Sequence, residues 1–284
     1  MRLLAALHLR SVALVAAVLA AGCVPRRPPP DLSTDPAQLL AQVRGAQARV
    51  VRVQGEARVR LGAPSKATFR QFAAAERPDR IHLEALDFFG NPAAVLVASG
   101  GRFSLYDPQK KVLYTGAATP ENLSRLVPVP VAAAELVEIL LGSAPLPEDR
   151  PVDVAPDGRH LRLRFEEDGA RLDAWIGAHA AVEKAARSVA GGAGPGSWKV
   201  EFSEHRAHGA AWFPDFFALR SDAANVRLEL RWEQLEVNGA LDPALFELRP
   251  PKGVQVIDVD EVAGTPGARD AFARPASSSA PPSP

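Results

Sequence analysis

Cys23 is the residue whose surroundings most directly predict a chemical modification. It is the only cysteine in the chain, and it follows basic residues, an apolar run at Val12–Ala21, and Gly22. This order is typical of a bacterial lipoprotein signal, in which the thiol accepts a diacylglycerol group and becomes the new amino terminus. We therefore expect residues 1–22 to be a signal peptide and Cys23 to carry the lipid. The alternative is an ordinary secretory signal or an uncleaved helix, but the apolar run is short for a membrane span.

Three further patterns could suggest catalysis or ligand binding, and none is convincing. His205 and His208 have the spacing of a metal-binding pair but lack a clear third ligand, so we expect surface histidines in a loop. The glycine-rich segment 191–196 precedes a strand, so it lacks a helix amino terminus that could bind phosphate. The acidic run at 166–168 is best explained as a solvated turn. We expect no enzymatic activity, no metal and no cofactor.

The composition predicts one globular domain between two extended segments. Lys and Arg total 33, as do Asp and Glu, so the formal charge is zero and a general attraction to nucleic acid is not indicated. We expect a proline-rich linker over 23–34, a folded domain over 35–263, and a disordered tail rich in Pro, Ser and Ala over 264–284. The domain has no cysteine pair, so its core alone must stabilise it.

The apolar residues change from helical spacing to alternation and back along the domain. Asp35 and Pro36 predict the start of a first helix. Two more helices are expected in the middle, one beginning at Thr119-Pro120 and one over 132–141. The expected strands lie at 51–61, 68–74, 80–86, 93–98, 102–106, 112–114, 161–165, 172–176, 182–189, 198–203, 216–220 and 226–237. We therefore predict a mainly β (α+β) fold, in which a single curled antiparallel sheet encloses helices.

Several short motifs, taken in order, resemble the LolB family of outer-membrane lipoprotein receptors. They are Asp79-Arg80-Ile81-His82-Leu83-Glu84, Asp87-Phe88-Phe89-Gly90, Tyr114-Thr115, Pro128-Val129-Pro130, and Leu136-Val137-Glu138-Ile139-Leu140-Leu141-Gly142. The stretch from Leu241 to Asp258 is similar to the end of the related periplasmic carrier LolA.

This resemblance implies an incomplete β-barrel with a helical lid over a hydrophobic cavity, which accepts acyl chains from a soluble LolA-like carrier. It also implies a monomer that is anchored by its lipid in the outer membrane and faces the periplasm. Val24, which is not Asp, agrees with that placement. The candidate cavity residues are Ile81, Leu83, Val95, Val97, Phe103, Leu105 and Tyr114 on strands, and Leu136, Ile139 and Leu140 on the lid helix. Taken singly, each is better explained as ordinary core, and only the combination of curled sheet and apolar lid favours a cavity.

Phe88 and Phe89 are the most prominent expected surface feature. They precede Gly90-Asn91-Pro92, so they should lie at a turn where at least one ring meets water. The resemblance implies that Phe89 matches a projecting apolar residue that helps to deliver cargo into the membrane, with Phe88 beside it. The alternative is that Phe88 turns inward and Phe89 packs on a neighbouring loop.

Two functions of other classes stay open beside lipid binding. A structural or assembly lipoprotein of the envelope would have the same anchor and fold, but its interior would be filled. An envelope hydrolase would need a polar cleft that holds a histidine beside a carboxylate.

Overall fold

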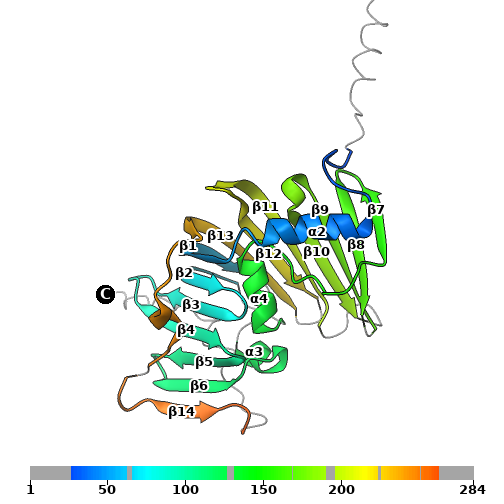
Figure 1. The fold of residues 1–284 in the computed structure, drawn as a ribbon. Helices are drawn as coiled ribbons and strands as arrows, with labels where there is room; N and C mark the ends of the chain where they lie inside the picture. Colours follow the sequence, from blue (N-terminus) through cyan, green and yellow to red (C-terminus); the bar gives the residue numbers. More distant parts are fainter. Residues whose placement is uncertain are drawn as a thin grey trace, which may run out of the picture.

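The computed structural model describes residues 27–62, 66–126, 131–167, 169–189, 196–222, 225–249 and 251–261. The predicted lipidation site at Cys23, the Pro128-Val129-Pro130 motif and the predicted tail lie outside these residues. Within the described ranges, the chain forms one sheet of fourteen strands, accompanied by three α-helices and two short 3-10 helices (Figure 1).

The strands are β1 (Arg52–Leu61), β2 (Ala67–Glu76), β3 (Arg80–Leu86), β4 (Pro92–Ser99), β5 (Arg102–Asp107), β6 (Val112–Ala117), β7 (Asp153–Asp157), β8 (His160–Glu167), β9 (Ala170–Ile176), β10 (Val182–Val189), β11 (Trp198–His208), β12 (Ala211–Ser221), β13 (Val226–Val237) and β14 (Gln255–Asp258). Their order across the sheet is β14-β6-β5-β4-β3-β2-β1-β13-β12-β11-β10-β9-β8-β7.

Two antiparallel meanders make up this sheet. Strands β1 to β6 form one and β7 to β13 form the other, and they join where β1 pairs with β13. Strand β14 pairs in parallel with β6, and it forms one edge while β7 forms the other. The sheet therefore curls without closing (Figure 1), which confirms the predicted mainly β fold with an incomplete barrel.

The junction of the two meanders depends on a glycine. The register between β1 and β13 shifts between Glu56 and Ala57, which is the mark of a β-bulge. At Gly55, just before the shift, a Cβ atom would lie 1.9 Å from the carbonyl oxygen of Gln234. Only glycine lets the two backbones approach this closely, so this position fixes how the halves of the sheet meet.

Helix α2 (Pro36–Gln47) begins where the sequence predicts. The Asp35 carboxylate accepts a hydrogen bond from the Gln38 backbone N–H at 2.9 Å, and Pro36 occupies the first turn. Its apolar side buries Leu39, Leu40 and Val43. The helix lies across the β7–β13 half of the sheet and contacts η1 (Ala178–Ala180) (Figure 1).

Helices α3 (Pro120–Leu126) and α4 (Ala133–Leu140) interrupt the strands, as predicted. Helix α4 packs against β2 and β3, in the other half of the sheet from α2. The buried apolar residues of α2 and α4 belong to the same core cluster. The two helices therefore share one face of the sheet, which we call the inner face (Figure 1).

The opposite, outer face carries a smaller apolar cluster beneath the C-terminal segment. Here η2 (Pro243–Phe246) packs against β3 and β4, and Phe246 joins Ala74 in the cluster. His82 Nδ1 donates a hydrogen bond to the carbonyl oxygen of Leu245 at 2.7 Å, and the Arg80 guanidinium lies 4.1 Å from the centre of the Phe246 ring. The chain then continues into β14.

The edges of the sheet depart most from the sequence-based expectation. Strands β7 and β14 were not expected, and both are short. Strand β11 continues past Ser203 to His208, and β12 begins at Ala211 instead of Phe216. Glu204 has φ 58 and is left out of the pairing of β11 with β12, but the register is the same on both sides of it, so the two strands stay paired past this irregular position.

Candidate functional site

Helix α4 covers part of the inner face with an almost wholly apolar surface. Its side chains Leu136, Val137, Ile139 and Leu140 are buried, whereas Ala134 is exposed. The Glu135 carboxylate accepts a hydrogen bond from the Ala132 backbone N–H at 2.8 Å, which caps the first turn. A helix of eight residues is not stable alone in water, so packing on the sheet holds α4 in place.

The structure brings eight of the ten predicted cavity residues together in the core cluster beneath and within α4. They are Ile81, Leu83, Phe103, Leu105, Tyr114, Leu136, Ile139 and Leu140, each at most 8% exposed. The strand members come from β3, β5 and β6. A continuous apolar layer therefore runs from α4 across this half of the sheet.

Val95 and Val97 belong to the outer face, which corrects the expectation for these two residues. The register pairs Leu83 with Leu96, and residues directly opposite on neighbouring strands share a face. Leu96 therefore faces inward, and its two neighbours join the cluster beneath η2. Every residue from Ala93 to Ala98 is apolar, so the sequence alone carries no alternation that could separate the two faces.

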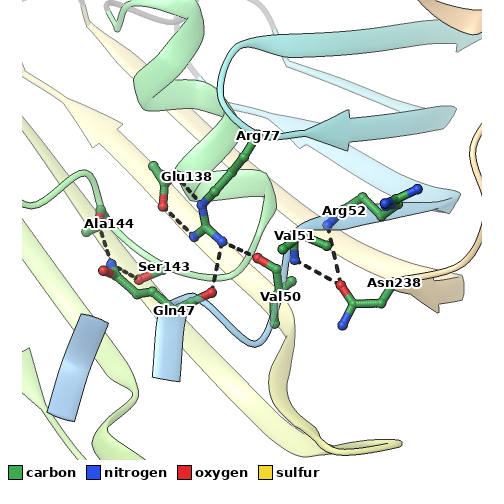
Figure 2. Close-up of polar contacts among 9 residues, drawn as sticks. All are labelled: Gln47, Val50, Val51, Arg52, Arg77, Glu138, Ser143, Ala144 and Asn238. Carbon is green, nitrogen blue, oxygen red and sulfur yellow. Dashed lines mark hydrogen bonds and ion pairs between the residues drawn. The ribbon is translucent and has the colours of Figure 1, made fainter. Parts of the chain in front are cut away.

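A half-buried arginine fastens α4 to the rim of the sheet (Figure 2). Arg77, in the β2–β3 turn, donates from Nε and Nη2 to the two carboxylate oxygens of Glu138, both at 2.7 Å. Its Nη1 donates to the carbonyl oxygen of Gln47 at 2.8 Å and to that of Val50. One guanidinium group thus connects α4, the end of α2 and the β2–β3 turn.

A glutamine side chain adds a second connection between the two helices (Figure 2). Gln47, the last residue of α2, donates from Nε2 to Ser143 Oγ at 2.6 Å and to the carbonyl oxygen of Ala144 at 3.0 Å. Ser143 and Ala144 directly follow α4 and the Leu141-Gly142 turn. We call Arg77, Glu138, Gln47 and Ser143 the latch, because together they hold the cover at one end of the strands.

The opposite end of β3 carries the two phenylalanines in a well-ordered turn. Phe88 is 93% exposed and Phe89 is 84% exposed, and their rings contact each other edge to face with centroids 5.5 Å apart. Neither ring packs into the core, so the alternative in which Phe88 turns inward is not observed. Neighbouring exposed aromatic rings of this kind are typical of a surface that contacts a membrane or another molecule.

The backbone of this turn is fixed by its own aspartate. Asp87 Oδ1 accepts hydrogen bonds from the backbone N–H groups of Phe89 at 2.9 Å and Asn91 at 2.8 Å. The bond from Asn91 is the main reason why the pKa of Asp87 lies below its ordinary value. Gly90, at φ 86, supplies the left-handed conformation that the turn requires. The rings are therefore exposed on a rigid support.

Comparison with solved structures identifies the architecture. A LolA superfamily protein from Nitrosomonas europaea matches 74% of this chain and 97% of its own length, with a TM-score of 0.51 and 9% identity. A DUF1329 family protein from Desulfovibrio piger matches 75% of this chain and 98% of its own length, with a TM-score of 0.52 and 12% identity. A putative outer membrane lipoprotein-sorting protein domain from Vibrio parahaemolyticus has a TM-score of 0.49 and 11% identity over 75% of this chain and 97% of its own.

The chain has a LolA-like fold. No protein-family model matches the sequence, and no curated protein is significantly similar to it. At identities of 9 and 12%, the two matches above a TM-score of 0.5 establish the fold alone.

The histidine pair of the LolA-like sheet differs from the expected surface loop. His205 and His208 both lie in strand β11 and are half-buried. His208 Nε2 lies 2.9 Å from Asp215 Oδ1, whereas the His205 ring stacks on Trp212 with centroids 6.4 Å apart. Burial lowers the pKa of His205, so this ring is neutral at pH 7.

The described residues show neither a metal-binding cluster nor a membrane-spanning helix. Their histidine, aspartate and glutamate side chains form no group of three or more that could hold a metal ion. None of the helices in these ranges has the length and apolarity that a membrane span needs. The arrangement that stands out is therefore a covered apolar face, a polar latch and an exposed aromatic turn.

Sequence reasoning found the apolar residues and the aromatic pair but missed the latch. Arg77 lies 61 residues before its partner Glu138, and Gln47 lies 96 residues before its partner Ser143, so neither pair belongs to a local motif. A cis peptide bond links Arg77 to Pro78 in the β2–β3 turn. Nothing in the local sequence reports which carboxylate such an arginine meets across the fold.

Proposed function

We propose that this protein is a lipid-anchored lipoprotein of the outer membrane that shelters acyl chains beneath α4 and passes them to the membrane. The cargo would be lipoproteins or other lipids received from a soluble LolA-like carrier in the periplasm. The observation that carries the proposal is the continuous apolar layer between α4 and the inner face.

The energetic need for such a shelter is large. Each methylene of an acyl chain that leaves water contributes about 0.8 kcal/mol, so a chain of some fourteen carbons needs roughly 10 kcal/mol of shelter. The inner-face residues of β3, β5 and β6 can supply apolar contact of this kind when α4 moves outward. An acyl chain would then replace the side chains of Leu136, Ile139 and Leu140 on the sheet.

The latch gives this movement a defined starting point. Helix α4 is capped in its first turn and packs on the sheet through its apolar side. Its polar contact with the β2–β3 turn is the ion pair between Glu138 and Arg77. Opening must break this ion pair, whose side chains are 24 and 22% exposed. Access to the inner face is therefore controlled at the rim and not by the apolar layer alone.

The exposed aromatic turn supports the delivery step. Phe88 and Phe89 are the most exposed large apolar side chains of the described residues. In our proposal they enter the boundary between headgroups and acyl chains, while the lipid on Cys23 holds the protein at the surface. Binding and release, without covalent catalysis, would then move the cargo.

Lipid uptake can be tested with a matched pair of substitutions on α4. Leu136→Gln places an amide on the covered side of the helix, and Ala134→Gln places the same amide on its exposed side. After extraction of copurified lipid, we expect wild type and Ala134→Gln to bind a fluorescent fatty acid and Leu136→Gln to bind it at least tenfold more weakly. Circular dichroism checks that both variants are folded.

Two results would count against the proposal. The first is purified wild-type protein that carries no acyl lipid detectable by mass spectrometry and binds no fatty acid, as expected for a structural lipoprotein with a filled interior. Equal binding by the two variants would place the fatty acid somewhere other than under α4.

A further inference from the structure

Basic residues lie on both sides of the exposed aromatic turn, at the same end of the sheet. We call this group the basic rim. It consists of Lys66, Arg70, Lys110, Lys111 and Lys252, all exposed. The whole chain has no net charge, so a gathering of five basic residues at one end of the sheet is a local feature.

Strand β2 supplies the first side of the basic rim. Its last pair with β3 joins Arg70 to Leu86, so residues 66–69 continue alongside the 87–91 turn. The Arg70 guanidinium reaches the turn itself, because its Nη2 lies 3.6 Å from where a Cβ of Gly90 would stand. Its nearest carboxylate, on Glu56, is 3.9 Å away, which is a weak pairing at an exposed position.

The β5–β6 turn and the segment before β14 supply the other side. Strand β5 pairs with β4, so the turn at 108–111 emerges at the same end of the sheet as the aromatic turn. The Gln255 backbone N–H donates to the carbonyl oxygen of Lys111 at 3.0 Å, which brings Lys252, three residues earlier, to this end as well. The rings of Phe88 and Phe89 thus have basic side chains on both sides.

Two carboxylates at this end, those of Asp87 and Asp107, are engaged by the backbone. Asp87 binds N–H groups of its own turn, as described above. Asp107 is 3% exposed and accepts from the backbone N–H groups of Gln109 and Lys110, both at 3.0 Å, and its Oδ2 lies 3.3 Å from Lys110 Nζ, so Lys110 is already paired. Among the described residues, Lys66, Lys111 and Lys252 form no ion pair. No described carboxylate neutralises the charge of these three exposed lysines.

We propose that the basic rim binds anionic phospholipid headgroups, so that the aromatic turn selects a negatively charged bilayer. The inference rests on the proposed membrane contact of Phe88 and Phe89 and deepens it by naming the lipid class. Long basic side chains around inserted aromatic rings reach the phosphate level while their methylene stems cover apolar surface. Each basic residue near an anionic surface strengthens binding by about fivefold.

The test measures vesicle flotation with the predicted mature chain, residues 23–284, carrying Cys23→Ser so that no lipid anchor contributes. All described helices and strands lie after this point. Vesicles contain phosphatidylcholine alone or phosphatidylcholine mixed with phosphatidylglycerol, at low and at high salt. The rim variant is Lys66→Glu with Lys111→Glu. The matched control is Arg49→Glu with Arg150→Glu, which changes net charge equally at exposed positions outside the rim.

We expect wild type and the control to prefer phosphatidylglycerol vesicles at low salt and to lose this preference at high salt. The rim variant should lose at least tenfold in binding to phosphatidylglycerol vesicles and keep its weak binding to phosphatidylcholine. Equal wild-type binding to both vesicle types, or an equal loss in the control, would overturn the proposal and would leave the rim available to an acidic protein surface.

Phe89→Glu separates this inference from the proposed function. If the rings insert, this variant loses binding to both vesicle types. If it binds phosphatidylcholine as wild type does, the proposed insertion fails even where the preference for phosphatidylglycerol is intact.

Discussion

The two ends of strand β3 treat their side chains in opposite ways. At its start, Arg77 is half-buried and its guanidinium is bound by Glu138 and two backbone carbonyls. At its end, Phe88 and Phe89 are exposed, and their rings contact each other edge to face. The charged groups at the first end support the fold, whereas the exposed apolar rings at the second end do not.

The two ends of β3 should therefore respond differently to substitution. The latch end connects three elements, so changes there should alter stability and the position of α4. The turn end has a backbone held by Asp87 alone, so changes to its rings should alter contacts with other molecules and leave stability unchanged.

Arg77→Leu should have the largest effect on stability. It leaves the half-buried Glu138 without its partner and removes the donor to the carbonyl oxygens of Gln47 and Val50. We expect a loss of about 2–4 kcal/mol in the free energy of unfolding, together with increased binding of a hydrophobic dye as α4 loosens. Urea denaturation and dye fluorescence measure the two effects.

An exposed ion pair provides the control for Arg77. Arg60 and Glu229 lie 3.2 Å apart with side chains 66 and 30% exposed, so Arg60→Ala should cost less than about 1 kcal/mol and leave dye binding unchanged. If Arg77→Leu behaves like Arg60→Ala, the latch does not hold the cover.

Aromatic residues at the two ends of the sheet should also differ. Trp212 is the second residue of β12, at the same end as the latch, and its ring contacts His179 at a centroid distance of 4.5 Å. Trp212 is 38% exposed, and we expect Trp212→Ala to cost about 1–2 kcal/mol of stability. Phe89→Ala should stay within about 0.5 kcal/mol of wild type by the same denaturation measurement. A larger cost for Phe89→Ala would mean that its ring supports the fold.

The smallest expected effect is a pH dependence at the latch end. Burial lowers the pKa of His205, while Glu183 and Asp215 act to raise it and Arg159 acts to lower it. Because the folded-state pKa lies below the unfolded value of about 6.5, the unfolded chain binds more protons as the pH falls. The contribution of neutral His205 is thus fully present above about pH 6.5 and is lost as the pH falls through this value toward the folded-state pKa.

His205→Gln should therefore reduce the fall in Tm between pH 7.5 and pH 5.5 by about 1–3 °C. Thermal unfolding followed by circular dichroism at the two pH values provides the measurement. An unchanged fall in Tm would show that another group titrates over this range and that the buried ring does not contribute.

The sequence pattern predicts the positions of helices and strands well, but it predicts less well which face of the sheet a residue lies on. The helix at Asp35-Pro36 and the strand at Arg80–Leu86 are confirmed, because capping and alternation are local signals. The prediction that Val95 and Val97 face the cavity was wrong, because an apolar strand that is covered on both faces shows no alternation in its sequence. Strand β14 was missed because its pairing with β6 spans more than 130 residues.

The candidate site divides in the same way. Exposure of Phe88 and Phe89 follows from two rings beside a Gly-Asn-Pro turn, so the sequence predicts it. The meeting of Arg77 with Glu138 depends on the path of the chain between them, so only the folded structure reveals it. Long-range polar pairs leave no periodic trace in a sequence.

The C-terminal segment has a consequence for how the protein reaches its folded state. It supplies both Phe246, which covers the outer apolar cluster, and β14, which pairs with the outermost strand of the first meander. A chain that has been synthesised or exported only as far as β13 presents an unpaired edge at β6 and uncovered valines. Such an edge can template intermolecular strand pairing. The C-terminal segment of the domain therefore protects the folded chain from aggregation by covering this edge and this cluster.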